Sequence, residues 1–206
     1  MYGCRLMDYR KTAKRAWKFI WDDDSVWSWI VNIILAFVLI KFIVYPGLGF
    51  ILGTTHPVVA VVSESMEHNQ PYDDWWVSSN WYAEHGITKE QFSDFKMRNG
   101  FAKGDIIVLG STKNVKVGDI IVFQTGKPDP IIHRVVAIWE EDGKRFYGTK
   151  GDNWRTNSQP IRNPVIDETR ITEQQLIGKA ILKIPYLGYI KIWFVEVINI
   201  LRAAVT

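Results

Sequence analysis

The stretch GDIIVLGSTKNVKVGDIIVF, residues 104–123, contains the run Gly-Asp-Ile-Ile-Val twice, beginning at Gly104 and again at Gly118. Isoleucine and valine favour extended backbone, and a glycine followed by an aspartate is typical of a turn that leads into a strand. The sequence has no third copy of the run, so the pair does not indicate a repeat architecture. We therefore expect two β-strands that are entered through similar turns.

Apolar runs of the same kind follow one another between the two ends of the chain, separated by Gly, Asp and Pro. The strands that they predict are Val58–Ser63, Asp105–Gly110, Asp119–Phe123, Ile131–Ile138, Arg145–Lys150 and Ile177–Ile184. Short strands with short connections pack as a small barrel or a folded sheet. We therefore predict a mainly β domain over residues 46–190.

Residues 71–103 of this domain form an aromatic-rich insertion with a helix signal. Thr88 can cap a helix, with Gln91 in the capping-box position, and Gly100 is a natural stop. The insertion also carries Trp75, Trp76 and Trp81. These rings either form a small satellite core that covers part of the sheet or contact the lipid surface.

The apolar run from Val26 to Tyr45 contains one charged residue, Lys41. At about 1.5 Å per residue, a helix of this length crosses the ~30 Å hydrocarbon layer of a bilayer. A buried core helix would need helical partners, a cleavable signal peptide normally has a shorter apolar region nearer the start, and an in-plane helix needs a polar face. We therefore predict a membrane-spanning helix over residues 26–45, ended by Pro46-Gly47.

The two flanks of this helix differ in positive charge. Residues 1–25 contain Arg5, Arg10, Lys11, Lys14, Arg15 and Lys18, whereas the next basic residue after Lys41 is Lys89. Because cytoplasmic flanks of membrane helices are enriched in Lys and Arg, we expect a cytoplasmic N-terminus, a single pass through the cell membrane and an extracytoplasmic β domain. Residues 191–206, whose apolar part is too short to span, are expected to lie in the interface or to pack on the membrane helix.

The composition excludes several classes of protein. The 206 residues suffice for one domain and an appendage, and 47% hydrophobic against 23% charged residues excludes a disordered chain. A net charge of +3 is too small to indicate a nucleic-acid partner. Cys4 is the only cysteine, which excludes an intramolecular disulfide and a cysteine-based zinc site. A zinc site built from His56, His68 and Asp73 has no recognised spacing, so we expect no metal.

Three residues could carry hydrolytic chemistry. Ser65 follows the first predicted strand, where its hydroxyl could be held rigidly and exposed. A serine needs a base within hydrogen-bond reach, and His133 is the one histidine inside a predicted strand. Histidine suits this role because its pKa ordinarily lies near 6.5. Asp152 could orient an imidazole. Taken singly, each of the three residues is also typical of an ordinary turn or of a protein core.

Motifs around these residues occur in a characteristic order. They are Ser63-Glu64-Ser65-Met66, Gly118-Asp119-Ile120-Ile121-Val122-Phe123, Ile132-His133-Arg134-Val135-Val136, Lys150-Gly151-Asp152-Asn153 and Ile184-Pro185-Tyr186-Leu187-Gly188-Tyr189. From about Val26 to Tyr189 the chain resembles the type I signal peptidase family. Histidine at position 133, where the bacterial branch has lysine, makes it similar to the archaeal branch and to the catalytic subunit of the endoplasmic-reticulum complex.

The resemblance implies a membrane-bound serine endopeptidase that removes signal peptides from exported preproteins, with no metal or organic cofactor. It assigns Ser65 as the nucleophile, His133 as the general base and Asp152 as the first aspartate of the Gly-Asp-Asn box. Ser63 matches the serine whose hydroxyl assists the oxyanion hole beside the Ser65 N–H. The implied partners are signal-peptide-bearing preproteins, the lipid bilayer and possible membrane partner subunits.

Two matters stay open from the sequence. The family often has a second aspartate about six residues after the first, and here Ser158 stands in that position. The catalytic triad is therefore completed by Asp152 alone or by Asp167 from the following loop. The alternatives in function are an anchored β module that binds exported proteins without catalysis, and a narrow-specificity relative that processes a few surface proteins.

Overall fold

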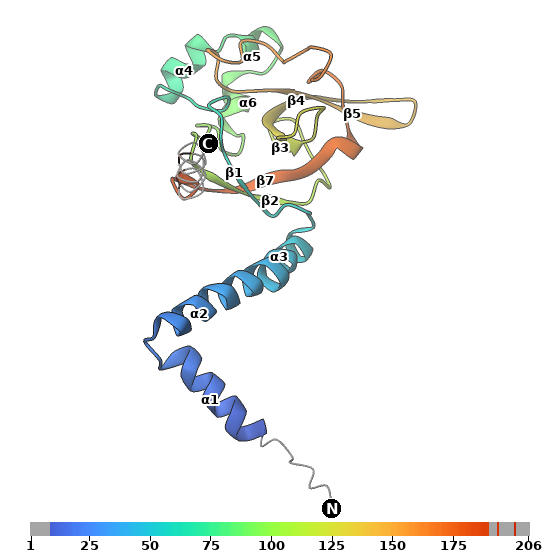
Figure 1. The fold of residues 1–206 in the computed structure, drawn as a ribbon. Helices are drawn as coiled ribbons and strands as arrows, with labels where there is room; N and C mark the ends of the chain where they lie inside the picture. Colours follow the sequence, from blue (N-terminus) through green and yellow to red (C-terminus); the bar gives the residue numbers. More distant parts are fainter. Residues whose placement is uncertain (1–8, 190–192, 194–199, 201–206) are drawn as a thin grey trace, which may run out of the picture. The chain divides into compact units, whose positions relative to one another are not determined.

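The computed structural model describes residues 9–189 together with Trp193 and Ile200 (Figure 1). The chain divides into two compact units, residues 1–48 and residues 49–206, which are treated separately below. The prediction for residues 191–206 falls outside the described residues, apart from Trp193 and Ile200, and stays a prediction.

The first unit is helical. Helix α1 spans Tyr9–Trp21, and Ser25 caps helix α2, Val26–Leu39, by accepting a hydrogen bond from the Ser28 N–H. Two polar side chains of α2 bind the end of α1, because the Ser28 hydroxyl donates to the Phe19 carbonyl at 2.6 Å and Asn32 Nδ2 donates to the Ile20 carbonyl at 2.9 Å. The sequence predicts residues 1–25 only as a basic segment, so helix α1 is an addition to that prediction.

The apolar helix is longer than predicted. After α2 the chain makes a π-helical turn, η1 (Ile40–Val44), and then continues as α3 (Tyr45–Leu52). The expectation that Pro46-Gly47 ends the helix is wrong, since the wide turn, in which the Tyr45 N–H donates to the Ile40 carbonyl, accommodates a proline that lacks an N–H. By length and composition, Val26–Leu52 is suited to cross a membrane.

The second unit contains a seven-stranded antiparallel sheet that curls into a half-barrel (Figure 1). Its strands are β1 (Val58–Ala60), β2 (Ile106–Gly110), β3 (Ile120–Phe123), β4 (Ile131–Glu141), β5 (Lys144–Lys150), β6 (Ile171–Thr172) and β7 (Leu176–Ile184). Their order across the sheet is β1-β2-β7-β3-β4-β5-β6. The predicted mainly β fold is confirmed, although the first strand ends at Ala60 instead of Ser63 and the short β6 was missed.

The two repeated runs become β2 and β3, which flank β7 and do not pair with each other. Gly104 and Gly118 have φ values of 91° and 93°, a conformation that favours glycine. In each turn the aspartate side chain accepts a backbone N–H, from Ala102 to Asp105 at 3.0 Å and from Lys116 to Asp119 at 2.9 Å. The prediction of two similar turns leading into strands is therefore confirmed.

The insertion folds as three short helices, α4 (Tyr72–Ser78), α5 (Trp81–Glu84) and α6 (Lys89–Ser93), of which α4 and α5 lie at the top of the view in Figure 1. They enclose a satellite core of Trp75, Tyr82, Ile87 and Phe92, with Trp76 and Trp81 packed against it. The predicted capping box of Thr88 and Gln91 is present. The helix ends at Ser93, with Asp94 as its C-cap, and does not continue to Gly100.

Candidate active site

Ser63 and Ser65 lie in the turn that follows β1. Their hydroxyl oxygens are 3.2 Å apart and hydrogen-bonded. The next side chain, Met66, is fully buried in the hydrophobic cluster that contains Ile107 and Leu109, and this contact fixes the end of the turn. Both serines are therefore held on a rigid support, and their hydroxyls face each other.

His133 lies on β4 opposite Ile121 of β3, and only 2% of its surface is exposed. A Cβ atom placed on Gly151 would be 2.7 Å from the Ser65 carbonyl oxygen and 2.9 Å from His133 Nε2. The turn that carries Ser65 and the imidazole therefore converge on the same glycine. The Ser65 hydroxyl is hydrogen-bonded to the Ser63 hydroxyl. The hydrogen bond between a nucleophile and its base is often long or poorly aligned until substrate binds.

The Gly-Asp-Asn segment holds the serine turn in place. The Asn153 N–H donates to the Ser65 carbonyl at 2.9 Å, and Asn153 Nδ2 donates to the Glu64 carbonyl at 2.9 Å. The Asp152 N–H approaches the Met66 sulfur at 3.4 Å. The backbone of this segment therefore fixes where Ser65 lies.

The Asp152 carboxylate, the expected third member of the triad, is hydrogen-bonded to residues other than His133. It accepts hydrogen bonds from Arg134, at 2.6 Å from Nη2 and 3.0 Å from Nε, and from the Tyr82 hydroxyl at 2.7 Å. His68 Nε2 lies 3.2 Å from it. Burial alone would raise the pKa of Asp152, but the Arg134 charge and the hydrogen bonds of His68 and Arg134 outweigh burial and hold that pKa well below its usual range.

The carboxylate that contacts His133 is Glu168, whose Oε1 is hydrogen-bonded to His133 Nδ1. The other alternative, Asp167, is exposed and accepts the N–H of Thr169 at 2.9 Å in its own turn. Glu168 is not among the residues proposed from the sequence, whereas its neighbour Asp167 is. The only signal available was the absence of an aspartate at position 158.

Lys150 is a further buried charge near the site, and only 1% of its surface is exposed. Its Nζ donates to the Gly151 carbonyl at 2.8 Å and lies 4.9 Å from the centre of the Tyr82 ring. Burial lowers the pKa of Lys150 to about 8, and the negative charges of Asp152 and Glu168 oppose that shift. The lysine thus ties the Gly-Asp-Asn segment to the insertion.

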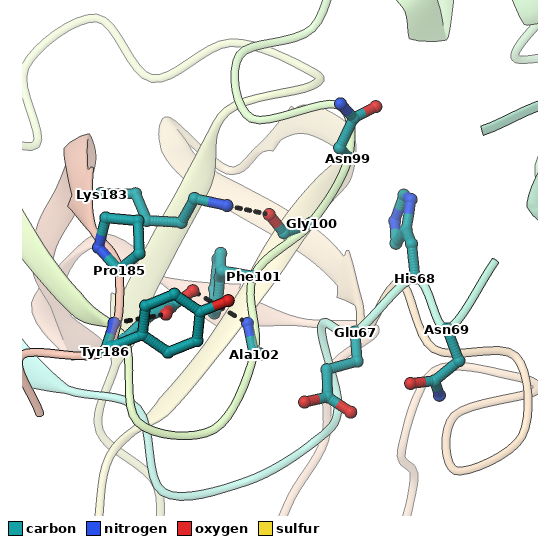
Figure 2. A pocket seen from close by; sticks show the side chains of 11 residues that line it. Glu67, His68, Asn69, Asn99, Gly100, Phe101, Ala102, Lys183, Pro185 and Tyr186 are labelled. Carbon is teal, nitrogen blue, oxygen red and sulfur yellow. Dashed lines mark hydrogen bonds between the residues drawn. The ribbon is translucent and has the colours of Figure 1, made fainter. Parts of the chain in front are cut away.

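A cavity of about 340 Å³ opens where the chain continues beyond Ser65 (Figure 2). Glu67 and His68 line one side, and Lys183 and Tyr186 lie across from them; Lys183 Nζ donates to the Gly100 carbonyl at 3.1 Å. Among the residues that the structure describes, no group of three or more His, Cys, Asp or Glu side chains is arranged to hold a metal ion.

Comparison with known proteins identifies relatives of this chain. It is 32% identical over 153 residues to the signal peptidase complex catalytic subunit sec11 of Schizosaccharomyces pombe, covering 74% of each chain. It is 30% identical over 162 residues to the subunit SEC11 of Lachancea thermotolerans, covering 75% of this chain and 76% of the relative. It is 24% identical over 197 residues to SEC11 of Plasmodium falciparum, covering 95% of this chain and 85% of the relative.

No family model matches the chain. The alignments nevertheless cover about three quarters or more of each relative, and all three relatives are named as catalytic subunits of the signal peptidase complex. The resemblance carried by the sequence motifs points to the same activity. The chain therefore belongs to the type I signal peptidase family, in the branch of the SEC11 catalytic subunits.

Proposed function

We propose that Ser65 and His133 carry out the peptide-bond hydrolysis by which this signal peptidase removes signal peptides from preproteins. The observation that supports these roles most strongly is the convergence on Gly151, where the Ser65 backbone and His133 Nε2 lie 2.7 Å and 2.9 Å from one point. A nucleophile and its base need this closeness because proton transfer requires hydrogen-bond reach.

The reaction proceeds in two halves. The Ser65 hydroxyl oxygen attacks the carbonyl carbon before the scissile bond, and His133 Nε2 takes the hydroxyl proton. His133 then returns that proton to the leaving amine as the C–N bond breaks, which leaves an acyl group on Ser65. A water molecule, deprotonated by His133, attacks the ester; as the ester C–O bond breaks, His133 returns the proton to the Ser65 oxygen and the signal peptide leaves as a carboxylic acid.

Two donors stabilise the oxyanion that forms in each half. They are the Ser65 N–H and the Ser63 hydroxyl, which already lies 3.2 Å from the Ser65 hydroxyl. Removing one such donor typically costs roughly 3–4 kcal/mol of transition-state stabilisation. The hydrogen bond between the two hydroxyls supports this pairing of roles.

The substrate binds as an extended strand. Strand β1 is an edge strand of the sheet and leads directly to the serine turn, so its free side can pair with a peptide backbone. By resemblance to the family, small side chains such as alanine are preferred one and three positions before the cut.

The apolar helix anchors the enzyme to the bilayer. The basic flank before Val26 favours a cytoplasmic N-terminus, a single pass and an extracytoplasmic catalytic unit. The S. pombe relative is named as a subunit of a complex, and we extend this to partner subunits in the membrane for this chain.

The experiment is cleavage of a signal-bearing preprotein by the full-length chain in lipid or detergent, with the new N-terminus read by mass spectrometry. Wild type is compared with Ser65→Ala and with the control Ser158→Ala, which alters an exposed serine. We expect one cut after a small residue, lost in Ser65→Ala and kept in the control. Equal cleavage by Ser65→Ala would overturn the assignment of the nucleophile.

The same experiment separates the alternatives. A non-catalytic binding module gives no cut with any folded preparation. A narrow-specificity relative cuts a few surface proteins and leaves general preproteins intact, which a panel of preproteins reveals.

A further inference from the structure

We infer that Glu168 is the positioning residue for His133 and that Asp152, which the family motif offers for this role, instead holds the insertion in place. The inference rests on the proposed function, because it concerns the base that activates Ser65. It assigns the third position of the catalytic triad to Glu168, in the loop before β6, and not to Asp152 of the Gly-Asp-Asn segment.

The first argument is the contact itself. Glu168 Oε1 is hydrogen-bonded to His133 Nδ1, while His133 Nε2 faces Gly151 and the Ser65 turn. A carboxylate at Nδ1 accepts the N–H there and keeps Nε2 free of a proton. This is the tautomer in which an imidazole can take a proton from serine.

The second argument is that Glu168 is held rigidly. The side chain is fully buried, and its Oε2 accepts the Ile161 N–H at 2.6 Å. The Thr149 hydroxyl donates to Oε1 at 2.9 Å. Its backbone is fixed as well, since its N–H donates to the Ile161 carbonyl and its carbonyl accepts the Thr149 N–H, both at 2.9 Å. A carboxylate so held can fix the orientation of a ring.

The third argument is that Asp152 is fully engaged elsewhere. Arg134, Tyr82 and His68 surround its carboxylate. Arg134 also donates to the carbonyls of Lys96 and Met97 at the end of the insertion, at 3.0 Å and 3.1 Å. The Asp152 side chain therefore joins the Gly-Asp-Asn segment to the insertion, whereas its backbone neighbours position Ser65.

Two other charged side chains bear on the His133–Glu168 pair. Lys150 on the adjacent strand β5 interacts with the charges of both Glu168 and Asp152. Arg134 is next to His133 in sequence, but its charge is paired with Asp152. The negative charge on Glu168 is therefore the one that stabilises the imidazolium formed during the reaction.

The test measures the activity of two variants at position 168, one that changes the charge of the side chain and one that changes its length. Glu168→Gln keeps the shape and removes the charge, whereas Glu168→Asp keeps the charge and shortens the side chain. We expect Gln to lower kcat by roughly 10²–10⁴-fold with little change in KM, and Asp to retain more activity than Gln. The exposed neighbour supplies the matched control, because Asp167→Asn should leave kcat unchanged.

A second readout does not depend on activity. In the full-length chain labelled with ¹⁵N-histidine in micelles, the nitrogen shifts of His133, assigned with His133→Gln, should show the Nδ1–H tautomer. Glu168→Gln should change that tautomer, and Asp152→Asn should leave it in place. A wild-type His133 in the Nε2–H tautomer would overturn the inference, even if Glu168→Gln did not fold.

The inference and the proposed function fail separately. If Ser65→Ala cleaves like wild type, the proposed function is wrong whatever His133 does. If Ser65→Ala is inactive but Glu168→Gln stays within about twofold of wild type, Glu168 has only a structural role. In a His133→Ala background Glu168→Gln should cost nothing further, because the two side chains act as a unit.

Discussion

At the scale of single residues, the site separates two carboxylates that the sequence does not distinguish. Asp152 carries the family motif, yet it neutralises the buried Arg134, whereas Glu168 contacts His133. Replacing Asp152 removes the partner of a buried charge, which commonly costs about 3–5 kcal/mol of stability. Loss of activity in an Asp152 variant would therefore report on folding before it reported on catalysis.

Lys150 makes the stability of the protein depend on pH in a direction that can be measured. Burial lowers its pKa to about 8, whereas a lysine in an unfolded chain has a pKa near 10.4. Below pH 8 both states hold the proton, and the folded state bears the cost of a buried charge. Above pH 8 the unfolded chain binds more protons than the folded one, so the contribution of Lys150 to stability rises until about pH 10.4.

We therefore expect wild type to gain stability relative to Lys150→Met as the pH rises from 7 to 10. The expected gain is about 2 kcal/mol, measured as the difference in free energy of unfolding in detergent. Using the difference between the two proteins cancels the groups that they share. Parallel pH curves for wild type and variant would contradict the buried position of this amine.

At the scale of elements, strand β5 and the glycine that follows it bring the two sides of the site together. Gly151 has no room for a side chain, since a Cβ there would lie 2.7 Å from both the Asn157 side chain and the Ser65 carbonyl. Gly148 on the same strand has its nearest contact at 3.4 Å, to the Ala137 side chain. The two glycines therefore form a matched pair for mutation.

We expect Gly151→Ala to lower kcat by at least ~10²-fold, because a small displacement of the reacting groups can cost that much. The added methyl would push the Ser65 turn away from His133. Gly148→Ala should keep near-normal kcat, and both variants can be followed by preprotein cleavage and thermal unfolding. Full activity of a folded Gly151→Ala would show that the convergence on this glycine is not required.

The elements also show how much of the structure the sequence could predict. Strand existence, the Gly-Asp turns and the capping box at Thr88 depend on local signals, and these predictions are confirmed. The insertion of β7 between β2 and β3 depends on pairing between distant segments, which no local pattern encodes. The same holds for Glu168, because its contact with His133 joins β4 to a loop far along the chain. The π-helical turn at Ile40–Val44 was not predicted, because a proline such as Pro46 normally ends an α-helix.

At the scale of the whole molecule, the chain combines an apolar helix with a unit that has its own cores. The buried clusters around Ile107 and Tyr147 both belong to residues 49–206. The helical segment Val26–Leu52 is suited to a bilayer, where a membrane-inserted preprotein also resides. Confining both molecules to one surface raises their effective concentration without any new contact.

Removal of residues 1–48 should therefore affect one kind of substrate and spare another. We expect cleavage of a membrane-inserted preprotein to fall on the order of 10²-fold, whereas kcat/KM for a short soluble peptide that spans the cut stays near the full-length value. Both rates are measured on the same preparations, with the peptide assay serving as the check on folding. Equal losses on both substrates would mean that the helix supports the catalytic unit itself.

The order of the site's parts along the chain has a consequence for biosynthesis. Ser65 leaves the ribosome early, His133 follows on β4, and Glu168 comes later still, just before β6. The contact between His133 and Glu168 can form only after the ribosome has synthesised the chain as far as Glu168. If Glu168 has the role inferred for it, a nascent chain carries a serine whose base is not yet oriented. The time needed to translate the last strands then acts as the delay that a removable pro-segment gives to a zymogen.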